Sequence, residues 1–303
     1  MKTIGVGQAH GKVIWMGEHA VVYGYLAIAI PLTSAHVMAT IKKSTQTTIS
    51  SQVYQGPIES GNDDIYPITT LIQALMHHFK ASPLDIKITS DIPHDAGLGS
   101  SAATASAVVE AFYDLYEETL NSDTRYNWVQ MSETIAHTNP SGIDARITML
   151  DTPIIYGKNQ PLKTITLDLD AYIVIGFTGV RGQTKKAVSS IQDIYNDHQT
   201  QNHIEALGNL TKDVISYVGK KNLLNIGLNM TKAHQHLSAL GVSLPMIDDM
   251  VLLALSNGAL GAKLTGGGLG GCVIALAQHQ DDAKKISEAW KNMTEQKTWM
   301  IHI

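Results

Sequence analysis

The sequence predicts an α+β protein of two domains, and three observations support this class. The chain has 303 residues and is 44% apolar, which is enough for more than one hydrophobic core. Short runs rich in β-branched residues and longer runs with helical spacing occur in both halves. Glycine-rich turns at 97–99 and 266–271 each follow a segment with strand character. We place the domain boundary in the polar stretch 158–165, which gives domains 1–162 and 163–303.

Strands are predicted to dominate the first part of the chain. Between residues 13 and 50 the apolar segments are short, β-branched and separated by Gly, Pro or polar residues. They read VIWM, AVVYGYLAIAIPL, HVMATI and TTISSQV. Residues 66–80 have the apolar spacing of an amphipathic helix, and residues 84–92 alternate as a half-buried strand does.

The stretch PHDAGLGSSAATA (93–105) follows this strand and opens a long helix predicted over 100–120. Ser100 or Ser101 is expected to cap that helix, because serine favours the N-cap position. The alanines would let the helix pack closely against its neighbours.

The remaining elements alternate helices and strands. A helix over 125–138 is ended by NPSG, and IDARITML begins a new element. The expected elements after it are a buried strand at 171–177, a helical layer over 184–240, a strand, glycine turn and strand over 262–277, a helix over 281–292 and the closing strand TWMIHI.

Composition argues against several classes of protein. The net charge is −5 and Lys and Arg form no long run, so we expect no nucleic-acid partner. Glu18 and His19 interrupt the longest apolar region, so we expect no membrane partner either. Cys272 is the one cysteine and lies in the apolar run CVIALA, which indicates a buried strand thiol and a reducing compartment. A cytoplasmic location is expected.

The loop GLGSSAA can hold phosphate without a lysine of its own. A Walker A loop needs Gly-Lys-Ser/Thr, and this loop has no lysine. The glycines allow close backbone approach, and the N–H groups of the following helix carry partial positive charge. The hydroxyls of Ser100 and Ser101 can bond a phosphate oxygen or ligate Mg²⁺. The alternative is a capped helix whose glycines serve only a tight turn.

The second glycine run, GGGLGG (266–271), satisfies the dinucleotide pattern Gly-x-Gly-x-x-Gly but lacks its context. That pattern must open a helix, whereas the strand-like CVIALA follows here. We therefore predict a glycine hairpin that lies against a ligand. Neither an HExxH metal motif nor a GxSxG nucleophile elbow occurs in the sequence.

Two further stretches place charged residues where a site lining is plausible. GKVIWMGEHAVVYG (11–24) carries Lys12, Glu18 and His19 in an apolar context, so these groups either pair in the core or line a site. In SETIAHTNPSGIDAR (132–146), Glu133 ends one helix and Asp144 starts the next element. Both could reach one cleft, although Asp144 could also serve only as a helix cap.

Taken together, the stretches GKVIWMGEHAVVYG, IPHDAGLGSSAA and KLTGGGLGG resemble, in this order, the three motifs of the GHMP small-molecule kinases. The similarity covers nearly the whole chain. GEHAVVYG, SETIAHTNPSGID and TGVRGQT are most similar to the branch of the family that phosphorylates mevalonate. The galactose branch usually continues GEH-x-DY, whereas AVV follows GEH here.

The resemblance implies a fold with two domains and an active site in the cleft between them. The N-terminal domain would contain a left-handed βαβ phosphate-loop unit, and the C-terminal domain would be a ferredoxin-like α/β domain. The expected reaction is phosphorylation of the C5 hydroxyl of (R)-mevalonate, with ATP as co-substrate and Mg²⁺ as cofactor. The oligomeric state is not readable, and a homodimer stays open.

The resemblance also assigns the site residues. Asp144 would be the general base with Lys12 beside it, and Ser101 and Glu133 would ligate Mg²⁺. The residues expected at the ATP phosphates are Gly97, Leu98, Gly99, Ser100, Ser101 and Ala102. The residues expected on the mevalonate side are Lys12, Glu18, His19, Ser141, Thr178 and Gly267.

Two departures from the family pattern stand out. His94 and Asp95 occupy loop positions where many relatives have small residues, and Thr138 replaces a common glycine. Asp95 would repel phosphate if it pointed at it, so we expect its side chain to face solvent or a basic neighbour. Two alternatives stay open: another kinase of the same family, such as a phosphomevalonate kinase, galactokinase or homoserine kinase, and a non-catalytic ATP and ligand sensor of the same fold.

Overall fold

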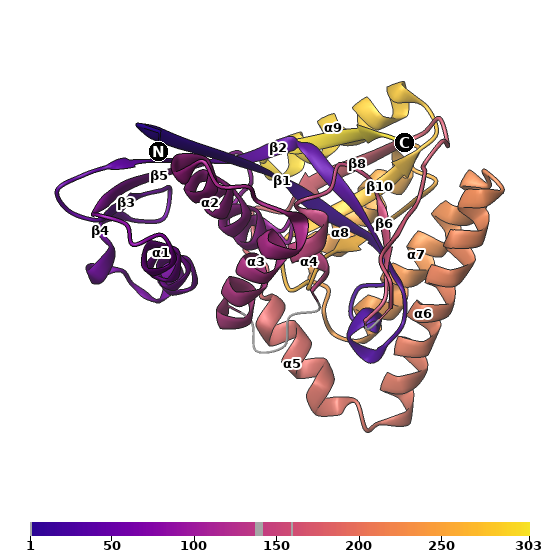
Figure 1. Cartoon of the computed structure of the whole chain (residues 1–303). Coiled ribbons are helices and arrows are strands. Elements are labelled where there is room, and N and C mark those ends of the chain that lie inside the picture. The colour runs from indigo at the N-terminus through magenta and orange to yellow at the C-terminus, as the bar shows by residue number, and fades with distance from the viewer. Residues whose placement is uncertain (1, 137–141, 159) are drawn as a thin grey trace. The chain divides into compact units, whose positions relative to one another are not determined.

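The computed structural model describes residues 2–136, 142–158 and 160–303, and its backbone forms two compact units. The first unit comprises Met1–Lys12, Pro31–Pro93 and Gly99–Asp151, and the second comprises Val13–Ile30, His94–Leu98 and Thr152–Ile303. The long strands β1 (Ile4–Met16) and β2 (Ala27–Lys43), both labelled in Figure 1, each contribute residues to both units. The boundary predicted between residues 162 and 163 stays a prediction.

The first unit combines a small mixed sheet with helices. Strand β5 (Leu84–Ser90) pairs antiparallel with β2 and parallel with β3 (Thr48–Ser50), which pairs antiparallel with β4 (Gln55–Pro57). The helical elements are η2 (Ile58–Ser60), η3 (Asp63–Ile65), α1 (Tyr66–His78), α2 (Ser100–Tyr116), α3 (Ser122–Ala136) and α4 (Ile143–Ile147). Helices α1, α2 and α3 pack against one another, and α2 also packs on β5.

Helix α2 lies unusually close to strand β1, and glycines on the strand make this approach feasible. A methyl group at Gly5 would lie 2.2 Å from the Ala111 carbonyl oxygen, and one at Gly7 would lie 2.1 Å from that of Ala107. The alanine-rich face of α2 is the matching small surface, as the sequence predicts. This packing fixes the helix whose N-terminus follows the GLG loop.

In the second unit an antiparallel sheet is covered by helices. Its strand order is β11-β8-β10-β9, with β8 (Tyr172–Phe177), β9 (Gly261–Thr265), β10 (Cys272–Ala277) and β11 (Thr298–His302). The first residues of β2 pair with β6 (Ile154–Tyr156), which pairs with β7 (Lys163–Thr164). The helical elements are η1 (Ala20–Tyr23), α5 (Thr184–Ile194), α6 (His198–Gly219), α7 (Leu223–Ala239), α8 (Pro245–Ser256) and α9 (Gln280–Thr294).

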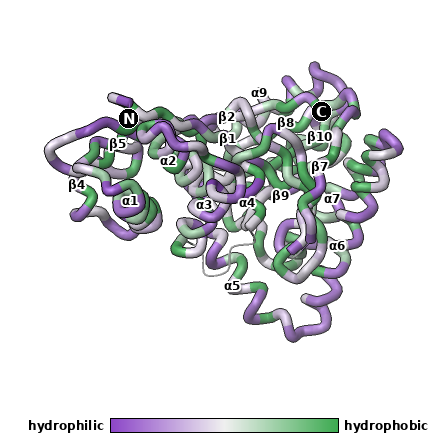
Figure 2. The backbone as a smooth tube through the Cα atoms, in the orientation of Figure 1, coloured by the Kyte–Doolittle hydropathy of each residue, from purple (hydrophilic) through white to green (hydrophobic). Residues whose placement is uncertain are grey.

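The core of the second unit lies between this sheet and its helices. Figure 2 shows β8 and β10 as strongly hydrophobic, and every residue of β10 is buried, including Cys272 as predicted. Helices α8 and α9 pack on these strands, and α7 packs on β9. Gly227 on α7 and Gly261 on β9 allow a backbone contact that a methyl group on either residue would prevent. No helix among the described residues has the length and apolar character needed to cross a bilayer.

Most predicted elements are confirmed, one helix is shorter than predicted, and one predicted strand segment is not a strand. The helix predicted over 100–120 ends at Tyr116, where Glu117 adopts a left-handed conformation with φ 57°. The segment AVVY is a 3₁₀ turn and not a strand, and residues with positive φ flank it: His19 with φ 58° and the left-handed Gly24 with φ 91°. The predicted α+β class is confirmed, since helices and strands occur in both units.

Candidate active site

The predicted phosphate loop ends in a helix that glycine caps. Gly97 and Gly99 have φ values of 76° and 74°, a left-handed conformation that side chains disfavour. Helix α2 begins at Ser100, its N-cap is Gly99, and no side chain bonds at the cap. The expectation that Ser100 or Ser101 caps the helix is therefore wrong. The left-handed cap favours glycine, and both serines fall in the first turn of the helix.

The residues expected at the phosphates can contribute mainly through their backbone. The side chains of Leu98 and Ala102 are fully buried, so only their main-chain groups are available to a ligand. Ser101 is exposed in the first turn of α2. The first N–H groups of a helix have no intrahelical acceptor, so this end of α2 is competent to bind an anion.

In the first unit the structure brings Lys12 and Asp144 together. Lys12 Nζ on β1 lies 3.0 Å from Asp144 Oδ1 on α4. The Lys12 side chain is buried at 3% exposure, whereas that of Asp144 is 32% exposed. Helix α4 has Gly142 as its N-cap and no side-chain cap, so Asp144 does not serve as a cap. The carboxylate is thus paired on one side and accessible on the other.

The start of α2 adjoins this ion pair. A methyl group at Gly99 would lie 2.9 Å from Cγ and 3.1 Å from Cε of Lys12, and 3.4 Å from Cγ2 of Thr148. The glycine therefore makes room for the lysine stem. Three predicted pieces of the site, the helix N-terminus, the ammonium and the carboxylate, are neighbours within one unit.

Glu133, the predicted metal ligand, is buried near the end of α3. Helix α3 packs on α2, which carries Ser101 in its first turn. Within the described residues no group of three His, Cys, Asp or Glu side chains is arranged to hold a metal. Ser141, predicted on the mevalonate side, lies outside the described residues, as do His137 and Thr138.

In the second unit Glu18 forms a buried ion pair with Lys263. The carboxylate Oε1 accepts a hydrogen bond from Lys263 Nζ, and the two side chains are 1% and 0% exposed. Lys263 Nζ also donates to the Leu264 carbonyl at 2.7 Å. The sequence indicated that Glu18 needs a partner but did not identify Lys263. The available signal in the sequence was a lysine, Lys263, in the segment predicted as the strand before the glycine hairpin.

His19 is held neutral against the glycine hairpin. Its Nε2 lies 2.9 Å from the Gly267 carbonyl oxygen, which can only accept, so Nε2 carries the proton. Burial lowers the pKa of His19 to about 4; the hydrogen bond to Gly267 raises it and the nearby Lys263 charge lowers it further. Nδ1 is then the acceptor nitrogen of the ring.

This histidine should make stability depend on pH. The folded-state pKa of His19 is about 4 and the ordinary value is 6.5. Between these pH values His19 is therefore mostly protonated in the unfolded chain and mostly neutral in the folded chain. The free energy of unfolding should therefore fall by up to about 3 kcal/mol as pH drops from 6.5 to 4. Urea titrations at several pH values across this range give the free energy of unfolding. Its dependence on pH should be steeper for wild type than for His19→Gln. The exposed His302→Gln serves as control, and equal slopes for wild type and His19→Gln would contradict the assignment.

The glycine hairpin predicted at 266–271 is confirmed. Strands β9 and β10 pair antiparallel with Thr265 opposite Cys272, and no helix follows the glycines, which excludes the dinucleotide fingerprint. Thr178 is buried near the hairpin's end. Its hydroxyl donates to the Gly271 carbonyl at 2.8 Å and accepts from the Val180 N–H at 3.1 Å. Its predicted contact with substrate stays a prediction.

Asp95 has the basic neighbour that was expected. Its side chain is 46% exposed, and Oδ1 lies 3.2 Å from Nδ1 of His94. The main chain of Asp95, with φ 56°, accepts a hydrogen bond from Gly182 N at 2.7 Å. The residue therefore contributes to the loop through its backbone.

Asp95→Asn should consequently have little effect on ATP binding. An exposed carboxylate is largely screened by water, so we expect the KM for ATP to change less than about threefold. Steady-state kinetics with ATP varied at saturating acceptor measure this. A large fall in that KM would mean that Asp95 faces the phosphates and repels them.

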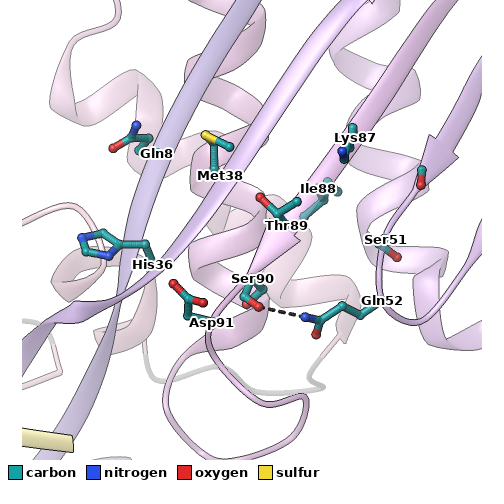
Figure 3. Close-up of a pocket in the computed structure, with 11 residues that line it drawn as sticks. Gln8, His36, Met38, Ser51, Gln52, Lys87, Ile88, Thr89, Ser90 and Asp91 are labelled. Atoms are coloured by element: carbon teal, nitrogen blue, oxygen red, sulfur yellow. Dashed lines mark hydrogen bonds between the residues drawn. The ribbon is translucent and has the colours of Figure 1, made fainter.

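A hollow on the sheet of the first unit is separate from the predicted site residues (Figure 3). Its volume is about 560 Å³, and β1, β2, β3 and β5 contribute to its lining. Gln52 Nε2 donates to the Ser90 carbonyl across it at 2.8 Å. None of the predicted site residues lines it.

Comparison with known proteins agrees with the motifs. Residues 59–151 match the family described as "GHMP kinases N terminal domain", and residues 214–296 match "GHMP kinases C terminal". The chain is 33% identical to the mevalonate kinase of Pyrococcus horikoshii over 90% of this chain and 88% of that protein.

Solved structures extend the similarity to the whole chain. The crystal structure of mevalonate kinase from methicillin-resistant Staphylococcus aureus is 29% identical, with a TM-score of 0.77 over 99% of both chains. The phosphomevalonate kinase of Streptococcus pneumoniae, 19% identical, reaches a TM-score of 0.83 over 98% of this chain and 99% of that one. The second match concerns the fold alone. The fold therefore does not distinguish a mevalonate kinase from a phosphomevalonate kinase.

Proposed function

The chain belongs to the GHMP kinase family, and from this premise we propose that it transfers the γ-phosphoryl group of ATP to the C5 hydroxyl of (R)-mevalonate. It is an ATP-dependent small-molecule kinase. The observation that carries the proposed chemistry is the ion pair of Lys12 with the accessible carboxylate of Asp144. The identity of the acceptor is supported by the mevalonate kinases that share about a third of its residues.

Asp144 would act on the proton of the acceptor hydroxyl. Its carboxylate accepts or orients that proton while the C5 oxygen forms a bond to the γ-phosphorus. The bond from the γ-phosphorus to the β,γ-bridging oxygen breaks, and ADP leaves with that oxygen. The partial exposure of Asp144 is consistent with this role, because a base must reach a substrate.

Lys12 would supply fixed positive charge at the same place. Its buried ammonium would stabilise the developing alkoxide and the moving phosphoryl group. A buried cation needs no reorganisation during the reaction, so its field is more effective than that of a surface lysine.

The GLG loop and the start of α2 would hold the triphosphate. Gly97 and Gly99 permit the backbone to approach, and the N–H groups of Leu98, Ser100, Ser101 and Ala102 are the candidate donors. The hydroxyl of Ser100 can add a further hydrogen bond to phosphate.

Ser101 and Glu133 are suited to hold Mg²⁺ with the phosphates. One is an exposed hydroxyl and the other a buried carboxylate, and they lie on helices that pack together. Hard oxygen ligands, with only one or two from protein carboxylates, are what Mg²⁺ prefers beside substrate phosphates. When bound, the ion would offset the negative charge of the phosphate oxygens.

The mevalonate side would be formed by Lys12, Glu18, His19, Ser141, Thr178 and Gly267. Within the second unit, the Glu18 carboxylate and His19 Nδ1 are both hydrogen-bond acceptors, so they suit hydroxyl groups of the substrate. Gly267 acts through its carbonyl, which orients His19.

A panel of acceptors tests the proposal. ADP release should be measured with mevalonate, galactose, homoserine and phosphomevalonate, each with and without Mg²⁺. We expect turnover with mevalonate that requires the metal. A preference for another acceptor would refute the substrate, and binding of ATP without turnover of any acceptor would indicate a sensor.

A further inference from the structure

The buried ion pair of Glu18 and Lys263 joins two motifs that lie far apart in the sequence. Glu18 belongs to the GEH turn after β1, and Lys263 opens KLTGGGLGG on β9, 245 residues later. Both side chains are essentially inaccessible to solvent. Placing two charges in such an environment is costly unless each satisfies the other.

Lys263 is the central charge of a larger polar cluster in the second unit. The positive charge of Lys263 lowers the pKa values of both His19 and His234, a residue of α7. Burial is the main cause that lowers the pKa of His234, and the carboxylate of Asp248 on α8 opposes it. His234 Nε2 lies 3.0 Å from Asp248 Oδ1, which also accepts from Ser243 Oγ at 2.6 Å.

Stability alone does not account for a charged pair at this place. Uncharged side chains of similar size can stabilise a buried position as well as an ion pair does, whereas removing one partner leaves an unpaired buried charge. What the pair does supply is a fixed orientation of the Glu18 carboxylate. The ammonium, anchored on the Leu264 carbonyl, fixes one oxygen of Glu18, while Gly267 in the same hairpin fixes the ring of His19.

We propose that Lys263 is a positioning residue for the alcohol substrate, acting through Glu18. It holds the carboxylate of the GEH turn in a fixed orientation beside the ring of His19, so that both present acceptors to the substrate's hydroxyl groups. This inference rests on the proposed function, because it takes Glu18 and His19 to line the acceptor site. Lys263 itself touches no substrate in this account.

The test compares Lys263→Met with the double variant Glu18→Gln/Lys263→Met. In Lys263→Met we expect the KM and the calorimetric Kd for mevalonate to rise about tenfold or more, while the KM for ATP changes less than about threefold. In the double variant both charges are gone, so the melting temperature should recover while acceptor affinity stays weak. The double variant also keeps the test possible if the single variant does not fold.

The pH profile separates positioning from a purely structural role. Without its counter-ion the buried carboxylate of Glu18 should take up a proton, so acceptor affinity in Lys263→Met should improve as pH rises from about 6 to 9. The other titratable groups of the cluster are Asp248, His19 and His234. Burial lowers the pKa values of both histidines, which disfavours a change of their charge over this range. A purely structural loss would weaken acceptor binding equally at every pH.

Two controls match the variants. Lys221→Met removes an exposed ion pair of the same unit, in which Lys221 Nζ lies 2.6 Å from Asp168 Oδ2. It should change neither the affinity for mevalonate nor that for ATP. Trp290→Phe removes a buried hydrogen bond to the Met250 carbonyl and should lower the melting temperature without a selective effect on the acceptor. If Lys263→Met behaves like Trp290→Phe, the proposal is wrong.

Failure of this proposal is distinguishable from failure of the proposed function. A wild-type chain that phosphorylates another alcohol of the panel would refute the substrate, and the same variants measured with that alcohol would still decide the role of Lys263. Near-wild-type affinity of both Lys263 variants for the true acceptor would refute the positioning role alone.

Discussion

Asp144→Asn is expected to lower kcat by about 10²–10⁴-fold while ATP binds as before. Asparagine keeps the size of the side chain but cannot accept the proton of the acceptor hydroxyl as a carboxylate does. The KM and Kd for ATP should stay close to wild type, because the phosphates are assigned to the GLG loop and α2. Steady-state kinetics with mevalonate and calorimetry with ATP make the comparison.

Asp123→Asn is the matched control for this variant. Asp123 is also an aspartate of the first unit, and its Oδ1 lies 3.7 Å from Arg146 Nη1. Its side chain is 87% exposed, so the substitution should leave kcat unchanged. Near-wild-type turnover of Asp144→Asn would remove Asp144 from the mechanism.

Lys12→Met should reduce kcat by about 10²–10³-fold and leave the fold intact. The variant loses the buried ammonium that stabilises the developing alkoxide and the transferred phosphoryl group. The fold should survive because Asp144 is one-third exposed and can be hydrated once its partner is gone. Circular dichroism and thermal melting report the fold, and initial rates report the chemistry.

Lys42→Met controls for the loss of a lysine from the same unit. Lys42 lies 3.3 Å from Asp85 and is 60% exposed, and an exposed pair of this kind contributes little. If Lys12→Met instead unfolds the chain, and a second change that neutralises Asp144 restores the fold, the pair is structural and the proposed role of Lys12 is wrong.

The spacing of apolar residues predicted the fold well in segments with a clear strand-like or helical periodicity or a continuous apolar run. The alternation of β5, the helical spacing of α1 and the apolar runs of β8 and β10 each predict the observed element. The pattern failed where backbone conformation overrides side-chain preference. AVVY is largely β-branched and apolar, yet it forms a 3₁₀ helix between two residues with positive φ, His19 and Gly24.

The candidate site was partly visible in the sequence. Similarity to a known family indicated that Lys12 lies beside Asp144, and the structure places the two 3.0 Å apart. The pairing of Glu18 was foreseeable only in part. Physical chemistry required a partner for a buried carboxylate, but the lysine comes from a strand 245 residues away, and nothing local identifies it.

The N-cap of α2 shows the same limit on a smaller scale. Serine is the better general cap, so Ser100 and Ser101 were the natural choices. The chain instead reaches the helix through a left-handed Gly99, since a side chain there would collide with the stem of Lys12. The contact of Gly99 with Lys12, which local residue preferences do not reveal, thus favours glycine at the N-cap.

The position of the transferred phosphate tests the central claim most directly. Wild-type protein should be incubated with ATP, Mg²⁺ and (R)-mevalonate, and the product recorded by proton-coupled ³¹P NMR. Because C5 carries two protons and C3 carries none, phosphate on the C5 oxygen gives a triplet, and this is the predicted result. An uncoupled singlet from the C3 ester, or no new phosphomonoester at all, would contradict the proposal.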